Sequence, residues 1–160
     1  MTGDASRSLS EQKKLDATIK ELFEHKIVFN EYLGFTMGEQ TASSVSIDFK
    51  MRPELIGHYM HGRLHGGVIS AVLDAASGLA VIWKIADVYN AESADQILER
   101  FKALATIDIR VDYLRPGIGD TFTAKASVVR LGRRIAATHA ELCSNKVSQI
   151  ATSSGTYIVS

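Results

Sequence analysis

One acidic residue, Asp74, stands in the middle of an apolar stretch, within Val72-Leu73-Asp74-Ala75-Ala76. Taking a carboxylate out of water is costly unless the group is hydrogen bonded or paired. Two explanations stay open: the carboxylate caps a loop or pairs with a core histidine, or its poor solvation serves catalysis. Asp74 is therefore the first candidate for a residue that takes part in chemistry.

The tripeptide His65-Gly66-Gly67 lies shortly before this stretch. Two glycines allow a tight turn and let a ligand approach the backbone amides at the start of a helix. Such amides favour negative charge, including the oxyanion that develops during acyl transfer. A tight entry to the helix, without any ligand, is the other explanation for the same glycines.

Gly67 and Asp74 of one chain are too far apart to act on the same atom. On a regular helix, seven residues turn through about 700° and rise about 10.5 Å. A catalytic carboxylate must act within about 3 Å of its target. A shared site therefore requires two chains whose helices run side by side in opposite directions, with Asp74 of each meeting Gly67 of the other.

Three histidines near the glycine pair, His58, His61 and His65, have the spacing of possible metal ligands. The glycines between and after them disfavour one regular helix across all three positions. No nearby carboxylate completes a site, so we predict no metal, and we expect His65 to orient the turn.

The helices that must position these residues follow from capping signals and periodicity. Ser8 with Glu11 predicts a peripheral amphipathic helix, and Ser93 with Gln96 predicts a short surface helix. Between them, residues 67–85 are apolar nearly all round, as expected for a helix enclosed by other structure.

Alternating apolar residues predict the strands. A hairpin is expected over residues 35–50 and a loop over 52–64, followed after the long helix by strands near 107–113, 122–128, 135–142 and 150–159. In the first of these four strands, Ile107, Ile109, Val111 and Tyr113 should share one face.

This order of elements predicts an α+β fold. An antiparallel sheet of about six strands can bury a helix that is apolar all round only by curling over it. Part of that helix would stay uncovered, so a second copy should pack there and the protein should form at least a dimer.

Composition excludes several classes of function. The 160 residues are 46% hydrophobic, enough for one domain, and 18 basic residues balance 18 acidic ones, so no overall field attracts nucleic acid or an anionic membrane. The polar start and the single cysteine, Cys143, indicate no export signal and no disulfide. The most apolar window, residues 68–83, carries Asp74 and is short for a bilayer. We therefore expect a cytoplasmic protein that does not enter a membrane.

The motif His65-Gly66-Gly67 with Asp74, followed by Tyr113-Leu114-Arg115-Pro116-Gly117, resembles a known family. The resemblance is to hotdog-fold thioesterases of the 4-hydroxybenzoyl-CoA thioesterase superfamily, in the PaaI-like branch. It spans roughly residues 28–159. We accordingly divide the chain into an N-terminal tail with a peripheral helix, residues 1–27, and a hotdog thioesterase domain, residues 28–160.

The resemblance implies hydrolysis of an acyl-CoA thioester. The amide of Gly67 would polarise the thioester carbonyl, and Asp74 from the neighbouring subunit would be general base or nucleophile. The family often carries a hydroxyl residue at the place of Thr106, which would orient water or Asp74; an ordinary strand threonine is equally compatible with the sequence.

Substrate contacts are expected from two regions. Relatives usually carry an asparagine six or seven residues before the motif histidine, where this chain has Tyr59 and His58, so His58 is a candidate hydrogen-bond donor in its place. We expect further contacts from His65 and Gly66, and contacts with the phosphates of coenzyme A from Arg130, Arg133 and Arg134. A solvated hairpin is the alternative for these arginines.

The sequence thus predicts an acyl-CoA thioesterase that acts as a dimer or tetramer, with no metal or organic cofactor, since coenzyme A is part of the substrate. Two alternatives stay open: a non-catalytic protein that binds or senses acyl-CoA, and a hotdog dehydratase or hydratase. The inserted segment 87–103 carries an apolar stripe at Ile97, Leu98 and Phe101 that could close over the acyl chain.

Overall fold

The computed structural model describes residues 6–41 and 43–160. Its helical elements are α1 (Leu9–Glu21), the π-helical turn η1 (Leu22–Lys26), α2 (Val28–Leu33), the 3-10 turn η2 (Pro53–Leu55), α3 (Gly66–Val88) and α4 (Ala94–Phe101). Its strands are β1 (Thr36–Gln40), β2 (Val45–Lys50), β3 (Ile56–His58), β4 (Arg63–Leu64), β5 (Ala105–Tyr113), β6 (Thr121–Leu131), β7 (Ile135–Ser144) and β8 (Ala151–Ile158). Residues 1–5 of the predicted N-terminal tail and residue 42 of the predicted hairpin lie outside the described residues.

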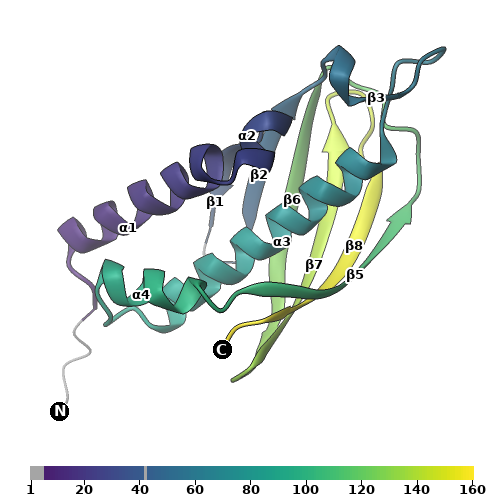
Figure 1. Ribbon diagram of the computed structural model, residues 1–160. Helices are drawn as coiled ribbons and strands as arrows, with labels where there is room; N and C mark the ends of the chain where they lie inside the picture. The colour runs from purple at the N-terminus through teal and green to yellow at the C-terminus, as the bar shows by residue number, and fades with distance from the viewer. Residues whose placement is uncertain (1–5, 42) are drawn as a thin grey trace.

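Six strands form one antiparallel sheet in the order β1-β2-β6-β7-β8-β5, which curves along the length of α3 (Figure 1). The prediction of an α+β fold with a curled sheet around one long helix is confirmed. Among the described residues, α3 is the one helix long and apolar enough to cross a membrane, with a mean hydropathy of 1.7. Because 61% of its most apolar 18-residue stretch is buried inside the protein, α3 is the core helix of the fold.

Small residues on the inner face of the sheet let α3 lie close to it. The buried inner positions of β6, β7 and β8 include Ala124, Ala126, Ala136, Ala140 and Ala151. Large apolar side chains of the helix, such as Val72 and Leu73, fill the space above them and are fully buried. The alternation predicted for residues 122–128 and 135–142 is confirmed, because their inward-facing members are the buried ones.

The alternation predicted for β5 is wrong at its start. The pairing of β5 with β8 shifts register between Thr106 and Asp108, which marks a β-bulge. As a result Ile107 points outward and is 55% exposed, whereas Ile109 and Val111 pack on the core. A bulge adds one residue to a strand and so changes which face the following side chains occupy. Thr106 is thereby turned toward α3.

The segment predicted as a loop, residues 52–64, contains more order than expected. After η2 it forms a short antiparallel hairpin of β3 and β4, separate from the main sheet. The backbone amide of His65 donates to the carbonyl of Leu55 at 2.8 Å, and that of Leu64 donates to Gly117 at 2.9 Å. These bonds fix the place where the chain enters α3.

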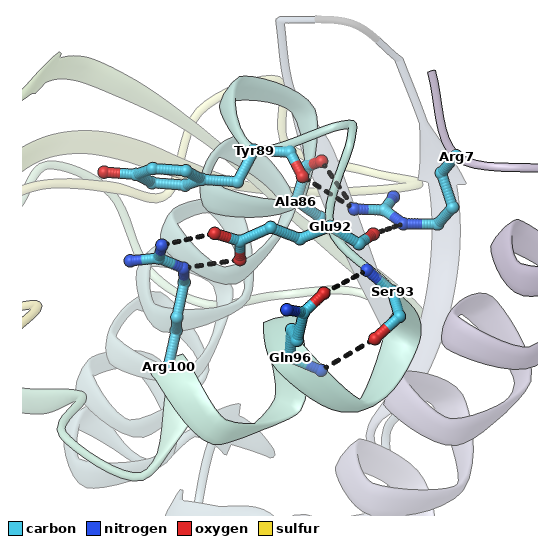
Figure 2. A network of polar contacts seen from close by, with 7 residues as sticks. All are labelled: Arg7, Ala86, Tyr89, Glu92, Ser93, Gln96 and Arg100. Atoms are coloured by element: carbon cyan, nitrogen blue, oxygen red, sulfur yellow. Dashed lines mark hydrogen bonds and ion pairs between the residues drawn. The ribbon is translucent and has the colours of Figure 1, made fainter. Parts of the chain in front are cut away.

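Helices α1 and α4 lie beside the C-terminal end of α3 (Figure 1). Ser8 caps α1 as predicted, but Glu11 does not complete that capping box: its carboxylate accepts from the amide of Ala94 at the start of α4. Arg7 donates to the carbonyls of Ala86, Tyr89 and Glu92, at 2.7 to 3.2 Å (Figure 2). A cation at the C-terminus of a helix satisfies carbonyls that have no helical partner. Arg7 therefore ties the N-terminal segment to the end of α3.

The predicted short helix α4 packs against the core of the protein along its apolar face. Ser93 and Gln96 form both hydrogen bonds of the predicted capping box (Figure 2). Ile97 is fully buried, and the side chains of Leu98 and Phe101 pack on the core. The apolar stripe that could have closed over an acyl chain is thus used for packing.

Glu92 and Arg100 form a bidentate ion pair beside α4, in which Arg100 Nε donates to Glu92 Oε2 at 2.7 Å and Arg100 Nη2 donates to Glu92 Oε1 (Figure 2). The Arg100 guanidinium also lies 3.7 Å from the centre of the Tyr89 ring. The hydrogen bond from Arg100 holds the pKa of the Glu92 carboxyl below its usual value of 4.5. A carboxyl whose pKa is lowered on folding stabilises the protein above its unfolded pKa, and this contribution is lost as the pH falls through the folded pKa.

Replacing Glu92 with Gln should therefore destabilise the protein by about 1 kcal/mol at pH 7. The difference in stability from the unchanged protein should narrow as the pH falls below 4.5 and through the lowered pKa of Glu92, because the carboxyl then becomes protonated in the unchanged protein too. Urea unfolding of both proteins at pH 7 and at a pH well below 4.5 measures these differences in the free energy of unfolding. Glu99→Gln is the matched control, because Glu99 pairs with Lys102 on the open surface and should change stability little. An equal loss at both pH values would contradict the assigned ion pair.

Candidate active site

The Asp74 carboxylate lies in the first half of α3, partly exposed among buried neighbours. Its Oδ1 accepts two hydrogen bonds, from Thr106 Oγ1 at 3.0 Å and from Tyr157 Oη at 2.9 Å. Among the described residues, no hydrogen bond to Oδ2 is found. The cost of partly burying this carboxylate is thus offset on one oxygen, and the other oxygen is left for a further partner.

Tyr157 comes from β8 and is only 1% exposed. Burial raises the pKa of its hydroxyl far above the ordinary value, and the nearby Asp74 charge raises it further. The hydroxyl therefore keeps its proton and acts as a donor. Sequence reasoning does not single out Tyr157. The alternation of β8 places it on the inner face, but only the fold shows that this face lies beneath Asp74.

The turn into α3 is held from two sides. His65 caps the helix, and its Nδ1 accepts from the amide of Gly67 at 2.8 Å, so this nitrogen carries no proton when the bond forms. The hydroxyl of Tyr113 donates to the carbonyl of Gly66 at 3.0 Å. Gly57 packs directly behind the histidine, since a Cβ there would lie 2.7 Å from the Cα of His65. The amide expected to bind an oxyanion is therefore already paired.

A hollow of about 370 Å³ opens beside this turn. Its lining includes three of the predicted substrate contacts, His58, His65 and Gly66, and two arginines that sequence reasoning missed, Arg63 and Arg115. The Nε of Arg63 is buried without a hydrogen-bond partner among the described residues. A cluster of guanidinium groups near a helix N-terminus favours an anionic or strongly polar ligand.

The remaining predicted contacts lie elsewhere. Arg130, Arg133 and Arg134 are exposed on and beside the turn between β6 and β7. Arg133 lines a separate small hollow of about 50 Å³ with Tyr89. One chain therefore does not bring these arginines to the hollow at His65. Among the described residues, no group of three or more histidine, cysteine or acidic side chains is placed to hold a metal ion.

One face of α3 is left without cover. Small residues line it on both sides of Asp74, and they are exposed or half-buried: Gly67, Ser70, Ala71, Ala75 and Gly78. Nothing lies within 4 Å of the position that a Cβ of Gly78 would occupy. A stripe of small residues permits the backbone of another element to come close. Gly67 and Asp74 lie on this same helix seven residues apart, so within one chain they do not converge.

Comparisons with known proteins agree with this architecture. The family model described as "Thioesterase superfamily" matches residues 61–151. The medium/long-chain acyl-CoA thioesterase YigI of Escherichia coli (strain K12) is 36% identical over 141 residues, covering 88% of this chain and 91% of that protein.

Solved structures give the same result. A crystal structure of a Shewanella oneidensis protein related to the thioesterase superfamily has 34% identity and a TM-score of 0.88, covering 96% of this chain and 99% of that one. The phenylacetic acid degradation protein PaaI of Thermus thermophilus has 25% identity and a TM-score of 0.59, covering 82% of this chain and 97% of that one. The chain therefore belongs to the thioesterase superfamily and has its hotdog fold.

Proposed function

We propose that this protein hydrolyses acyl-CoA thioesters to a free acid and coenzyme A. The observation that carries the proposal is Asp74: a carboxylate fixed through Oδ1 on the open face of the core helix, with Oδ2 unengaged by the described residues. The Escherichia coli relative acts on medium- and long-chain acyl-CoA, and its similarity covers most of both chains. We extend that substrate class to this protein.

The proposed site is shared between two copies of the chain. Supporting this, the uncovered face of α3 carries small residues, and β5 forms one edge of the sheet next to it, with Ile107 exposed. A second copy packed there, its α3 antiparallel to the first, would cover both features. Asp74 of one chain would then face the partner's Gly67, which resolves the separation of about 10.5 Å within one chain.

In the proposed reaction, Oδ2 of Asp74 drives attack on the thioester carbonyl carbon, either directly as a nucleophile or by taking a proton from water. The carbonyl oxygen becomes negatively charged as the carbon becomes tetrahedral. The partner's Gly67 amide stabilises that charge, and it can do so when the substrate oxygen shares or replaces His65 Nδ1 as acceptor. The C–S bond then breaks and coenzyme A leaves as its thiolate. Attack by water gives the free acid directly, whereas attack by Asp74 gives a mixed anhydride that water then hydrolyses to the free acid and the restored carboxylate.

Contacts with the rest of the substrate are part of the proposal. The wall of the hollow with His58, Arg63 and Arg115 supplies donors for polar groups near the thioester. The exposed arginines Arg133 and Arg134 are assigned to the phosphates of coenzyme A, whose charge they match.

A panel of acyl-CoA substrates of increasing chain length, assayed by release of free thiol, tests the function. We expect turnover that is highest with medium or long chains. Tight binding of acyl-CoA without thiol release would instead identify a sensing protein. A change at the acyl carbon chain, with the thioester intact, would identify a dehydratase or hydratase.

A further inference from the structure

Two hydroxyl groups reach the same oxygen of Asp74 from neighbouring strands. Thr106 and Tyr157, which donate to Oδ1, are direct partners in the antiparallel pairing of β5 with β8. Residues paired in this way point to the same face of a sheet. The pair therefore forms a cradle that contacts the carboxylate from the exposed side through Thr106 and from the core through Tyr157.

The ring of Tyr157 can take this position because residue 155 is glycine. A Cβ at Gly155 would lie 2.8 Å from Tyr157 Cε2, closer than carbon contacts allow, and 3.1 Å from its Oη, a tight contact. The same Cβ would lie 2.9 Å from Oγ1 of Thr138, which is paired with Gly155 on the neighbouring strand β7. Gly155 thus leaves the space in which the tyrosine ring lies back toward α3.

The second half of the cradle depends on the bulge in β5. Without the extra residue, Thr106 would fall on the outward face, in phase with Asp108 and Arg110 rather than with Ile109. Gly155 and the bulge in β5 therefore allow two hydroxyl groups to donate to Oδ1 of Asp74.

Two donors on one oxygen restrict the carboxylate to a single orientation. The side-chain torsion of an aspartate about its last bond is otherwise broad and twofold, so either oxygen could face a substrate. We infer that Tyr157 is a positioning residue that, with Thr106, holds Oδ1 of Asp74 so that Oδ2 is the oxygen that acts on the thioester. The inference rests on the proposed function, because it assigns the reaction to Asp74.

The test is Tyr157→Phe, with kcat and KM for an acyl-CoA substrate measured across pH. The loss of a hydrogen bond to a charged group should lower kcat roughly 10- to 100-fold. KM should stay within about twofold, since the hydroxyl does not contact the substrate. The acid limb of the kcat profile should move to higher pH, because a donated hydrogen bond favours the ionised carboxylate.

Gly155→Ala is a second variant that keeps every hydroxyl group. Its Cβ should displace the Tyr157 ring and reproduce the lower kcat and the shifted acid limb. Because both changes act through one hydroxyl, the double variant Tyr157→Phe with Gly155→Ala should have the kcat of Tyr157→Phe alone. If Tyr157→Phe fails to fold, Gly155→Ala still decides the question.

Ser153→Ala is the matched control, because it removes a buried hydroxyl of the same strand that has no hydrogen-bond partner among the described residues. It should leave kcat and the pH profile unchanged; the same shift of the acid limb in this control would overturn the inference. The inference would also be overturned if kcat and the pH profile were unchanged in both Tyr157→Phe and Gly155→Ala while Asp74→Asn was inactive. Full turnover by Asp74→Asn would instead overturn the proposed function.

Discussion

Asp74→Asn should lower kcat for acyl-CoA hydrolysis by roughly 100-fold or more. The amide has the size of the carboxylate, and its oxygen can still accept from Thr106 and Tyr157, so the protein should stay folded. What is lost is the negative charge and the basic oxygen at the open face of α3. Thiol release under saturating substrate, with a thermal melt of the same preparation, measures both effects.

Asp87→Asn is the matched control for this change. Asp87 lies on the same helix, is exposed, and pairs only with Lys84, at 2.8 Å, among the described residues. The same chemical change there should leave kcat unaltered. Full turnover by the Asp74 variant would show that another group drives the attack and would remove the basis of the proposed site.

Mixing two inactive variants should restore activity if the site is shared. One variant is Asp74→Asn; the other is Gly67→Pro, which removes the amide hydrogen in the first turn of α3, where proline is tolerated. The kcat of each variant alone should be roughly 100-fold lower than that of the unchanged protein. After co-refolding in equal amounts, about half of the dimers are mixed and each has one complete site, so roughly a quarter of the original turnover should return.

A complete site in one chain predicts a different result. In that case neither chain of a mixed dimer holds both groups, and mixing restores nothing. The control is the same mixture prepared without unfolding, which should stay inactive until subunits exchange. Recovery that appears only after exchange would support the antiparallel arrangement of the two copies of α3.

The bond between His65 and Gly67 bears on how the substrate binds. The amide that is expected to meet the oxyanion donates to His65 Nδ1, so the resting site already places an acceptor where the carbonyl oxygen should go. A developing negative charge is a stronger acceptor than a neutral ring nitrogen. The exchange of partners would therefore favour the transition state over the bound substrate, which is the condition for catalysis.

Much of the fold could be predicted from the sequence because its local signals agree. The apolar helix around Asp74, the alternation of β6 and β7 and the caps at Ser8 and Ser93 all appear as predicted. The failures have local causes. The extra residue at Ile107 broke the alternation of β5, and the short hairpin of β3 and β4 lay within a segment rich in glycine and proline signals.

The sequence by itself determined the curled sheet around one helix, since hydrophobic periodicity is a local property, and it predicts Asp74 and Gly67 as site residues from a lone acid in an apolar run and a glycine pair before it. Only the tertiary structure decided which groups surround that acid. Tyr157 lies 83 residues beyond Asp74 and is brought to it by the pairing of β8 with β5. Contacts between distant segments depend on strand register, bulges and space left by glycine, and none of these is visible in the spacing of residues along the chain.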